Sequence, residues 1–183
     1  EKRTYDACFV GRFHYQKGVL ELIKIWKLVC QKNPQAYLAM IGSGPLDKEV
    51  KNLIKKLGLS KNIYLAGFMD GPKKFEIFKQ SRLVLHPATF DSGGMAAAEA
   101  MAWGLPGVSF DLKALKTYYP KGMLKTNCFD TDEFAENIIS LLFDPFKYKA
   151  MSLEALQLVN EKWEWNNRAK DIYAQAIAQN LLA

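Results

Sequence analysis

A strand, a loop and a helix follow one another in LVLHPATFDSGGMAAAEAMA, residues 83–102. The apolar run Leu83–His86 is typical of a buried strand, and the small-residue run Gly94–Trp103 is typical of a helix that packs closely on a sheet. The loop between them carries Asp91 and two glycines. The order strand, loop, helix is the repeating unit of a parallel α/β sheet.

The same unit recurs on both sides of this segment. Apolar runs predict strands at Asp6–Gly11, Tyr37–Ile41, Ile63–Ala66, Leu83–His86, Gly107–Phe110 and Met123–Lys125. Helical spacing predicts helices at Lys17–Lys32, Leu46–Leu57, Pro72–Gln80, Gly94–Trp103, Asp132–Phe143, Pro145–Lys162 and Asn166–Leu182. We therefore expect an α/β fold in three layers, with a mostly parallel six-stranded sheet covered on both faces and helices at the C-terminal end. In such sheets a ligand binds beyond the carboxyl ends of the strands.

Length, charge and cysteine content set the bounds of function. The chain has 183 residues, which suits one domain, and no apolar run approaches the roughly 20 residues that span a bilayer. Its net charge of +6 suits an anionic ligand, a nucleic acid or an acidic membrane. Three separate cysteines without a signal peptide indicate a reducing compartment, and the chain begins without Met, so we expect a piece of a longer cytoplasmic protein.

The first predicted strand leads into GRFHYQKG, residues 11–18. Arg12 and Lys17 lie five residues apart on this loop, just before a helix N-terminus with its unpaired N–H groups and partial positive charge. Arg grips two oxygens at once and Lys acts as a mobile point charge, so the pair suits a diphosphate. The alternative is that both are solvated surface cations.

The second predicted strand ends in Gly42-Ser43-Gly44-Pro45. Glycines at this place let backbone approach a ligand closely. Asp47 stands where a dinucleotide-binding fingerprint has its third glycine, so the segment is a weak sign of an oxidoreductase. A plain turn is the alternative interpretation.

Two acids stand with seven residues between them, Asp91 on the loop and Glu99 in the helix. Glu99 interrupts an otherwise apolar run and therefore needs a partner. A carboxylate accepts two vicinal hydroxyls well, as ribose offers them, and Asp91 is placed to accept hydroxyls of a hexose. The alternatives are a helix-capping Asp91 and a solvated Glu99.

These motifs together resemble the C-terminal domain of group 1 glycosyltransferases, the retaining GT-B enzymes of glycosyltransferase family 4. Residues 11–18 match the family's Gly-Arg-x-x-x-x-Lys-Gly in register. Asp91 and Glu99, followed by AMAWGLP at residues 100–106, match its two-acid signature. Residues 42–45 also match, and Trp163 or Trp165 before Tyr173 is similar to the family's closing region. The resemblance covers nearly the whole chain and implies a Rossmann-like half of a GT-B fold.

The resemblance also implies a role for each matching residue. Arg12 and Lys17 would bind the diphosphate and stabilise charge on the departing nucleotide, and Asp91 would contact the donor sugar. Glu99 would hold the ribose hydroxyls. Other substrate-binding residues expected around the sugar and phosphates are Gly93, Gly94, Met95, Gly11, Gly42 and Ser43. The family uses a nucleoside-diphosphate sugar as substrate and needs neither a metal ion nor another cofactor in this site.

The function expected from the resemblance is transfer of a hexose, with retention, to a carbohydrate or lipid acceptor. Residues 1–183 would form the donor-binding domain, and the N-terminal domain with the acceptor site would be absent, so we expect the chain alone to be inactive. The departures from the family pattern lie near the donor sugar: Asp91 replaces Glu, Ser92-Gly93-Gly94 replaces Gly-Phe-Gly, and Asp111-Leu112-Lys113 replaces a Gly-Gly loop.

Three other functions remain as alternatives. A nucleotide-sugar epimerase would share the diphosphate site, and a non-catalytic nucleotide-sugar-binding module would have lost transfer. A nucleic-acid binder is the third, since Lys48, Lys51, Lys55, Lys56 and Lys61 would form a basic patch, although such a run is more often a solvated helix face. The same lysines would also suit a peripheral contact with the inner face of the cell membrane. We expect no nucleic-acid partner, because no basic motif is interleaved with aromatic residues.

Overall fold

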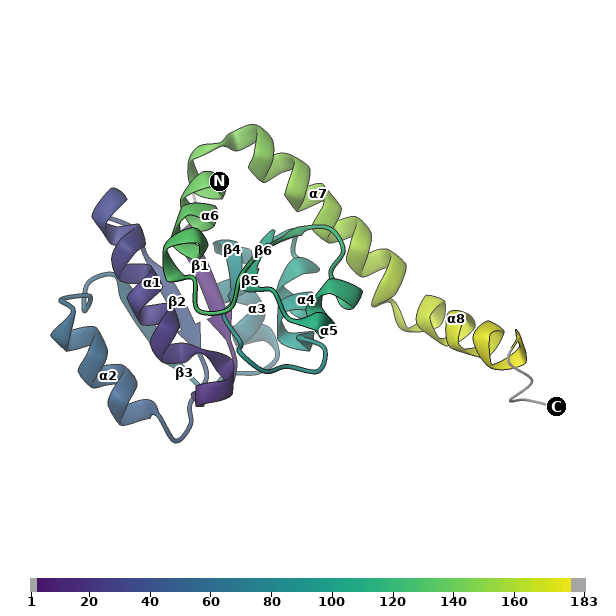
Figure 1. Cartoon of the computed structure of the whole chain (residues 1–183), viewed down its shortest axis with the longest axis horizontal. Helices are drawn as coiled ribbons and strands as arrows, with labels where there is room; N and C mark the ends of the chain where they lie inside the picture. Colours follow the sequence, from purple (N-terminus) through teal and green to yellow (C-terminus); the bar gives the residue numbers. More distant parts are fainter. Residues whose placement is uncertain (1–2, 179–183) are drawn as a thin grey trace.

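The computed structural model describes residues 3–178, and its centre is a six-stranded sheet in which every neighbouring pair is parallel (Figure 1). The strands are β1 Tyr5–Val10, β2 Leu38–Ile41, β3 Ile63–Gly67, β4 Ser81–His86, β5 Gly107–Phe110 and β6 Met123–Thr126. Their order across the sheet is β3-β2-β1-β4-β5-β6. The predicted α/β fold is confirmed, and this order is that of Rossmann-like folds.

Helices connect the strands and complete the C-terminal third. They are α1 Val19–Lys32, α2 Asp47–Lys56, α3 Pro72–Lys79, α4 Met95–Met101, α5 Lys113–Tyr118, α6 Thr131–Phe143, α7 Pro145–Lys162 and α8 Trp165–Ala178. A 3-10 turn, η1, spans Tyr15–Lys17. The predicted helix Asn166–Leu182 corresponds to α8, and its part beyond residue 178 lies outside the described residues.

Two buried clusters separate the sheet from its helices. On one face α1, α2 and α6 pack around Trp26 and Phe134, both fully buried. On the other face α3, α4, α5 and α7 pack against the sheet, and the buried alanines of α4 let that helix approach the strands closely (Figure 1). Each large apolar side chain buried in these layers contributes about 1.5–3 kcal/mol of transfer free energy. The three-layer arrangement is therefore fixed by apolar faces on both sides of the sheet.

The last two helices differ in how they pack against the sheet. Helix α7 runs along the second face, and α8 leads away from the sheet (Figure 1). None of the helices within residues 3–178 has the length and apolar character that crossing a bilayer requires.

Several element boundaries differ by one or two residues from the predicted ones, and one helix was not predicted. Helix α1 begins at Val19 rather than Lys17, because η1 and a left-handed Gly18 (φ 63°) precede it. Helix α4 begins only after Gly94, which is also left-handed (φ 62°). Helix α5 was not predicted at all, since Leu115 is its only buried residue and gives no periodic pattern.

Candidate functional site

The loops after β1 and β4 meet at the middle of the sheet's carboxyl edge. The two strands are neighbours, yet β1 leads to α1 on one face and β4 leads to α4 on the other. The loops join directly, because the backbone N–H of Thr89 donates to the carbonyl of Gln16 at 3.0 Å. Ligands of open α/β sheets bind at such a change of direction, so this edge is the candidate site.

Two glycines let three loops touch at this edge. Gly18 (φ 63°) lies so close to the loop after β4 that an added Cβ would stand 1.9 Å from the carbonyl oxygen of Pro87. Gly42 (φ 141°) brings the loop after β2 equally close to the loop after β1, residues 11–18, because an added Cβ would stand 1.9 Å from the carbonyl oxygen of Gly11. Both conformations are left-handed and favour glycine. The glycines therefore hold the predicted diphosphate loop between its two neighbours.

Lys17 and Asp91 form an ion pair across the junction. Nζ of Lys17 lies 2.6 Å from Oδ2 of Asp91, whose side chain is 8% exposed. The other oxygen, Oδ1, accepts hydrogen bonds from the backbone N–H groups of Gly93 at 3.1 Å and Gly94 at 2.8 Å. Nε2 of the buried His86 lies 3.1 Å from Oδ2. Asp91 therefore holds the backbone of Gly93 and Gly94 in place and also pairs with the basic loop, residues 11–18.

These contacts keep Asp91 ionised. Burial of the carboxyl raises its pKa, but the contacts with His86, Lys17 and the two backbone N–H groups lower it more. The pKa of Asp91 consequently lies well below its usual value near 3.8.

This lowered pKa predicts a pH-dependent stability. A carboxylate with a lowered folded pKa stabilises the protein fully above its unfolded pKa and loses that contribution as the pH falls below about 4. Asp91→Asn removes the charge, so we expect wild type and variant to differ most in unfolding free energy near neutral pH and less below pH 4. Urea titrations at both pH values measure this. Asp132→Asn, at an exposed position, is the control, and an Asp91→Asn effect independent of pH would refute the assignment.

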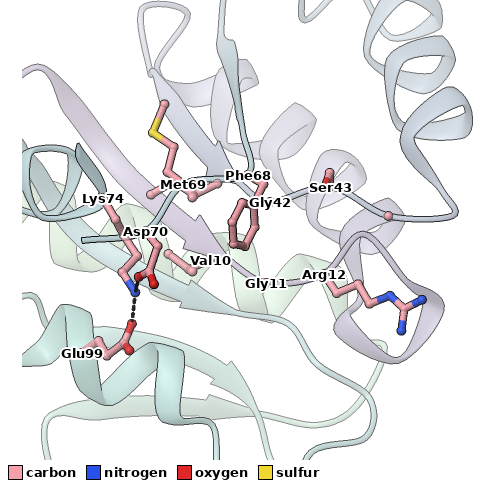
Figure 2. Close-up of a pocket in the computed structure, with 12 residues that line it drawn as sticks. Val10, Gly11, Arg12, Gly42, Ser43, Phe68, Met69, Asp70, Lys74 and Glu99 are labelled. Atoms are coloured by element: carbon pink, nitrogen blue, oxygen red, sulfur yellow. Dashed lines mark hydrogen bonds and ion pairs between the residues drawn. The ribbon is translucent and has the colours of Figure 1, made fainter. Parts of the chain in front are cut away.

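A first cavity of about 660 Å³ opens beside the loops after β1, β2 and β3 (Figure 2). It is lined by Val10, Gly11, Arg12, Ile41, Gly42, Ser43, Gly44, Phe68, Met69, Asp70, Lys74 and Glu99. Figure 2 shows Arg12 at one end and Glu99 with Lys74 at the other. Phe68 is 79% exposed and offers an apolar ring at the rim. The volume of the first cavity is in the range of small-molecule sites.

Glu99 has the partner that its place in an apolar helix requires. Nζ of Lys74 lies 2.9 Å from Oε2 of Glu99 and 3.0 Å from Oδ1 of Asp70. The Glu99 side chain is 43% exposed, whereas that of Lys74 is only 10% exposed. Burial lowers the pKa of Lys74, but its contacts with Glu99 and Asp70 raise that pKa by more than burial lowers it. The ammonium group therefore stays charged.

A second cavity, of about 360 Å³, lies on the other side of the basic loop. Its lining is Lys17, Asp91, Ser92, Gly93, Gly94, Met95, Tyr118, Trp163 and Arg168. The guanidinium carbon of Arg168 lies 5.9 Å from the ring centre of Tyr118 and 5.5 Å from that of Trp163. The second cavity therefore combines two cations with aromatic rings.

The structure brings every predicted site residue to one edge of the sheet, but divides them between the two cavities. Arg12, Glu99, Gly11, Gly42 and Ser43 line the first cavity. The second is lined by Lys17, Asp91, Gly93, Gly94 and Met95. The cavities adjoin, because the loop of residues 11–18 serves both and Met95 lies one helical turn from Glu99.

Several side chains of the site were not predicted from the sequence. Asp70 and Lys74 stand four residues apart, a helical spacing for an ion pair that could have been noticed. His86 was visible as the polar end of a buried strand. Tyr118 and Arg168 gave no signal, because their meeting depends on how the C-terminal helices pack.

Comparison with known proteins identifies the family. A family model described as "Glycosyl transferases group 1" matches residues 1–157. The poly(glycerol-phosphate) alpha-glucosyltransferase of Bacillus subtilis is 26% identical over 161 residues, covering 86% of this chain and 24% of that protein. The chain spans less than half the length of this and the other first curated relatives that it matches.

Solved structures share the fold. Anabaena HepE in complex with UDP and glucose superposes with a TM-score of 0.82 at 20% identity, covering 95% of this chain and 48% of that one. The C-terminal domain of a group 1 family glycosyl transferase from Francisella tularensis gives a TM-score of 0.76 at 20% identity, covering 88% and 87% of the two chains. Since the family model extends over most of its length, this chain belongs to the group 1 glycosyl transferases.

Proposed function

We propose that this chain is the donor-binding domain of a longer glycosyltransferase, which moves a hexose from a nucleoside-diphosphate sugar to a carbohydrate or lipid acceptor. The observation that carries the proposal is the contact between the basic loop, residues 11–18, and the two-acid segment, Asp91–Glu99. Two adjoining cavities lie at this contact. Family membership supports a transferase. The acceptor site would belong to another domain of the longer protein, and the 183 residues alone would transfer no sugar.

The two cavities suggest how a donor would lie. The nucleoside would occupy the first cavity, with its ribose hydroxyls on Glu99, and the sugar would lie near Asp91 in the second. The diphosphate would then pass between the cavities, along the loop that carries Arg12 and Lys17. Fixed cations stabilise the negative charge that develops on a leaving diphosphate. We propose that they bind the donor without a metal ion or another cofactor.

The hexose and the stereochemistry are supported by the relatives. The Bacillus subtilis relative is an alpha-glucosyltransferase by name, and the Anabaena structure contains UDP and glucose. We propose that the donor sugar is a hexose and that its anomeric configuration is retained. The configuration of the product made by the full-length protein, read from its anomeric NMR coupling, tests retention.

One observation favours a second candidate, a module that binds the donor without transferring it. Both oxygens of Asp91 already have partners: Lys17 and His86 at Oδ2 and two backbone N–H groups at Oδ1. A carboxylate so engaged has less capacity to accept the hydroxyls of a sugar. Donor binding by the full-length protein, with neither transfer nor hydrolysis, would favour this candidate over the transferase.

Calorimetric titration with UDP, GDP and ADP tests the proposed site. We expect at least one of them to bind more tightly than its monophosphate, because the basic loop recognises the second phosphate. Glu99→Gln should weaken that binding about tenfold or more, since hydrogen bonds to a charged group are worth about 1.5–3 kcal/mol. Glu136→Gln, an exposed position on α6, is the matched control. Equal binding by Glu99→Gln and wild type would remove Glu99 from the site.

A further inference from the structure

Lys74 connects two carboxylates at the end of the first cavity away from Arg12. Its side chain comes from α3, whereas Glu99 comes from α4, twenty-five residues later (Figure 2). Nζ lies 2.9 Å from Oε2 of Glu99 and 3.0 Å from Oδ1 of Asp70. Lys74 is the buried member of the group, at 10% side-chain exposure, against 43% for Glu99 and 77% for Asp70. The ammonium group is therefore the fixed point, and the carboxylates are held by it.

This arrangement matters because Glu99 is not held by burial. A long, partly exposed Glu samples several rotamers, and a ligand that needs one of them bears the entropy cost of selecting it. An ion pair made before binding removes part of that cost. Lys74 engages Oε2, so Oε1 is the carboxylate oxygen that remains for a ligand in the cavity.

The rest of the cavity shows which ligand groups would meet this oxygen. Backbone at Gly11, Gly42 and Gly44 and the ring of Phe68 supply close approach and apolar surface. Glu99 with Asp70 supplies hydrogen-bond acceptors at the end away from Arg12 (Figure 2). The cavity thus offers acceptors for paired hydroxyls, an apolar surface for a flat ring and a cation for an anion, and a ribonucleotide carries these three kinds of group.

We infer that Lys74 is a positioning residue that aims the Glu99 carboxylate at a ribose and thereby makes the site select ribonucleotides over 2′-deoxyribonucleotides. The inference rests on the proposed function. A site that hydrogen-bonds a substrate hydroxyl rejects the analogue that lacks it, and the rejection is strong only when the acceptor is fixed in place. Without Lys74, the carboxylate is free to turn to water, and loss of one hydroxyl then costs little.

The test compares dissociation constants for UDP and 2′-deoxy-UDP, and for GDP and 2′-deoxy-GDP, by calorimetry on the 183-residue chain. Wild type is expected to prefer the ribonucleotide about tenfold or more, the usual effect of one hydrogen bond to a charged group. Lys74→Met should bring the preference to about threefold or less, with most of the loss falling on the ribonucleotide. Lys74→Arg should retain a preference between these values. Lys73→Met, an exposed neighbour on the same helix, should match wild type.

Two further variants keep the result interpretable. If Lys74→Met does not fold, Asp70→Asn takes its place, because Asp70 is exposed and its loss frees one side of the ammonium group. It should lower the preference for the ribonucleotide below the wild-type value, and an unchanged preference would count against the inference. In a double-mutant cycle, Glu99→Gln and Lys74→Met should be non-additive in the preference for ribose.

The outcomes separate this inference from the proposed function. If wild type binds none of the diphosphates, the proposed function itself fails. If wild type binds them but accepts the 2′-deoxy analogues equally well, the inference is wrong and the donor site stands. If Lys74→Met weakens both nucleotides by the same factor and keeps their ratio, Lys74 contributes only charge or stability, and the inference is also wrong.

Discussion

In the full-length protein, Arg12→Ala is expected to lower kcat by about 10²–10³-fold, the usual effect of removing one group that stabilises developing negative charge. Arg12 is exposed at the end of the first cavity. Among the residues that the structure describes, no carboxylate lies within ion-pair distance of it. Its guanidinium therefore remains available to a diphosphate, and its removal should leave the fold intact.

Steady-state rates at saturating donor measure this effect. Arg12→Lys should recover part of the loss, because lysine keeps the charge but not the two-oxygen grip of the guanidinium. Lys24→Ala, which removes an exposed cation from α1, serves as the charge-matched control and should leave kcat unchanged. A normal kcat for Arg12→Ala would mean that the loop does not meet the leaving group.

Gly18→Ala is expected to destabilise the fold by on the order of 4 kcal/mol or more, an effect that single substitutions seldom reach. An alanine there would adopt a left-handed conformation, at a cost of about 1–2 kcal/mol. Its Cβ would also stand 1.9 Å from the carbonyl oxygen of Pro87, so the backbone of one loop would have to move. The substitution would thus separate the two loops that form the site.

Gly58→Ala is the matched control for this prediction. Gly58 has a similar φ of 70°, but nothing lies within 4 Å of its added Cβ, so it bears only the conformational cost of about 1–2 kcal/mol. Urea unfolding of both variants measures the difference. Equal losses of unfolding free energy would show that the loops after β1 and β4 are not in contact at Gly18.

Most of the fold follows from local sequence patterns. The six strands are short apolar runs between turn residues, and such runs are recognisable one at a time. The missed α5 shows the limit, because Leu115 alone faces the core and six residues give no period. The order of the strands across the sheet depends on which helices cover which face. That order makes β1 and β4 neighbours, and it therefore places the loops after these two strands together.

The order of strands and helices predicted the site residues that follow strands, and Glu99 was predicted from its motif and the family resemblance. Arg12, Lys17 and Asp91 stand just after strand ends, so a parallel sheet brings them to one edge. The contact of Lys74 with Glu99 joins two helices and depends on packing that no local pattern contains. The predicted site residues line two cavities, and the Lys17–Asp91 ion pair belongs to the wall of the second.

We expect one nucleotide to contact both the loop of residues 11–18 and the segment Asp91–Glu99. An NMR titration of the isotope-labelled chain with UDP and with GDP tests this placement. Backbone amide signals of residues 11–18, 42–44 and 91–99 should move together and saturate at one ligand per chain. Shifts confined to the groove between α2 and β3, around Tyr37, Lys51 and Tyr64, would rule the placement out.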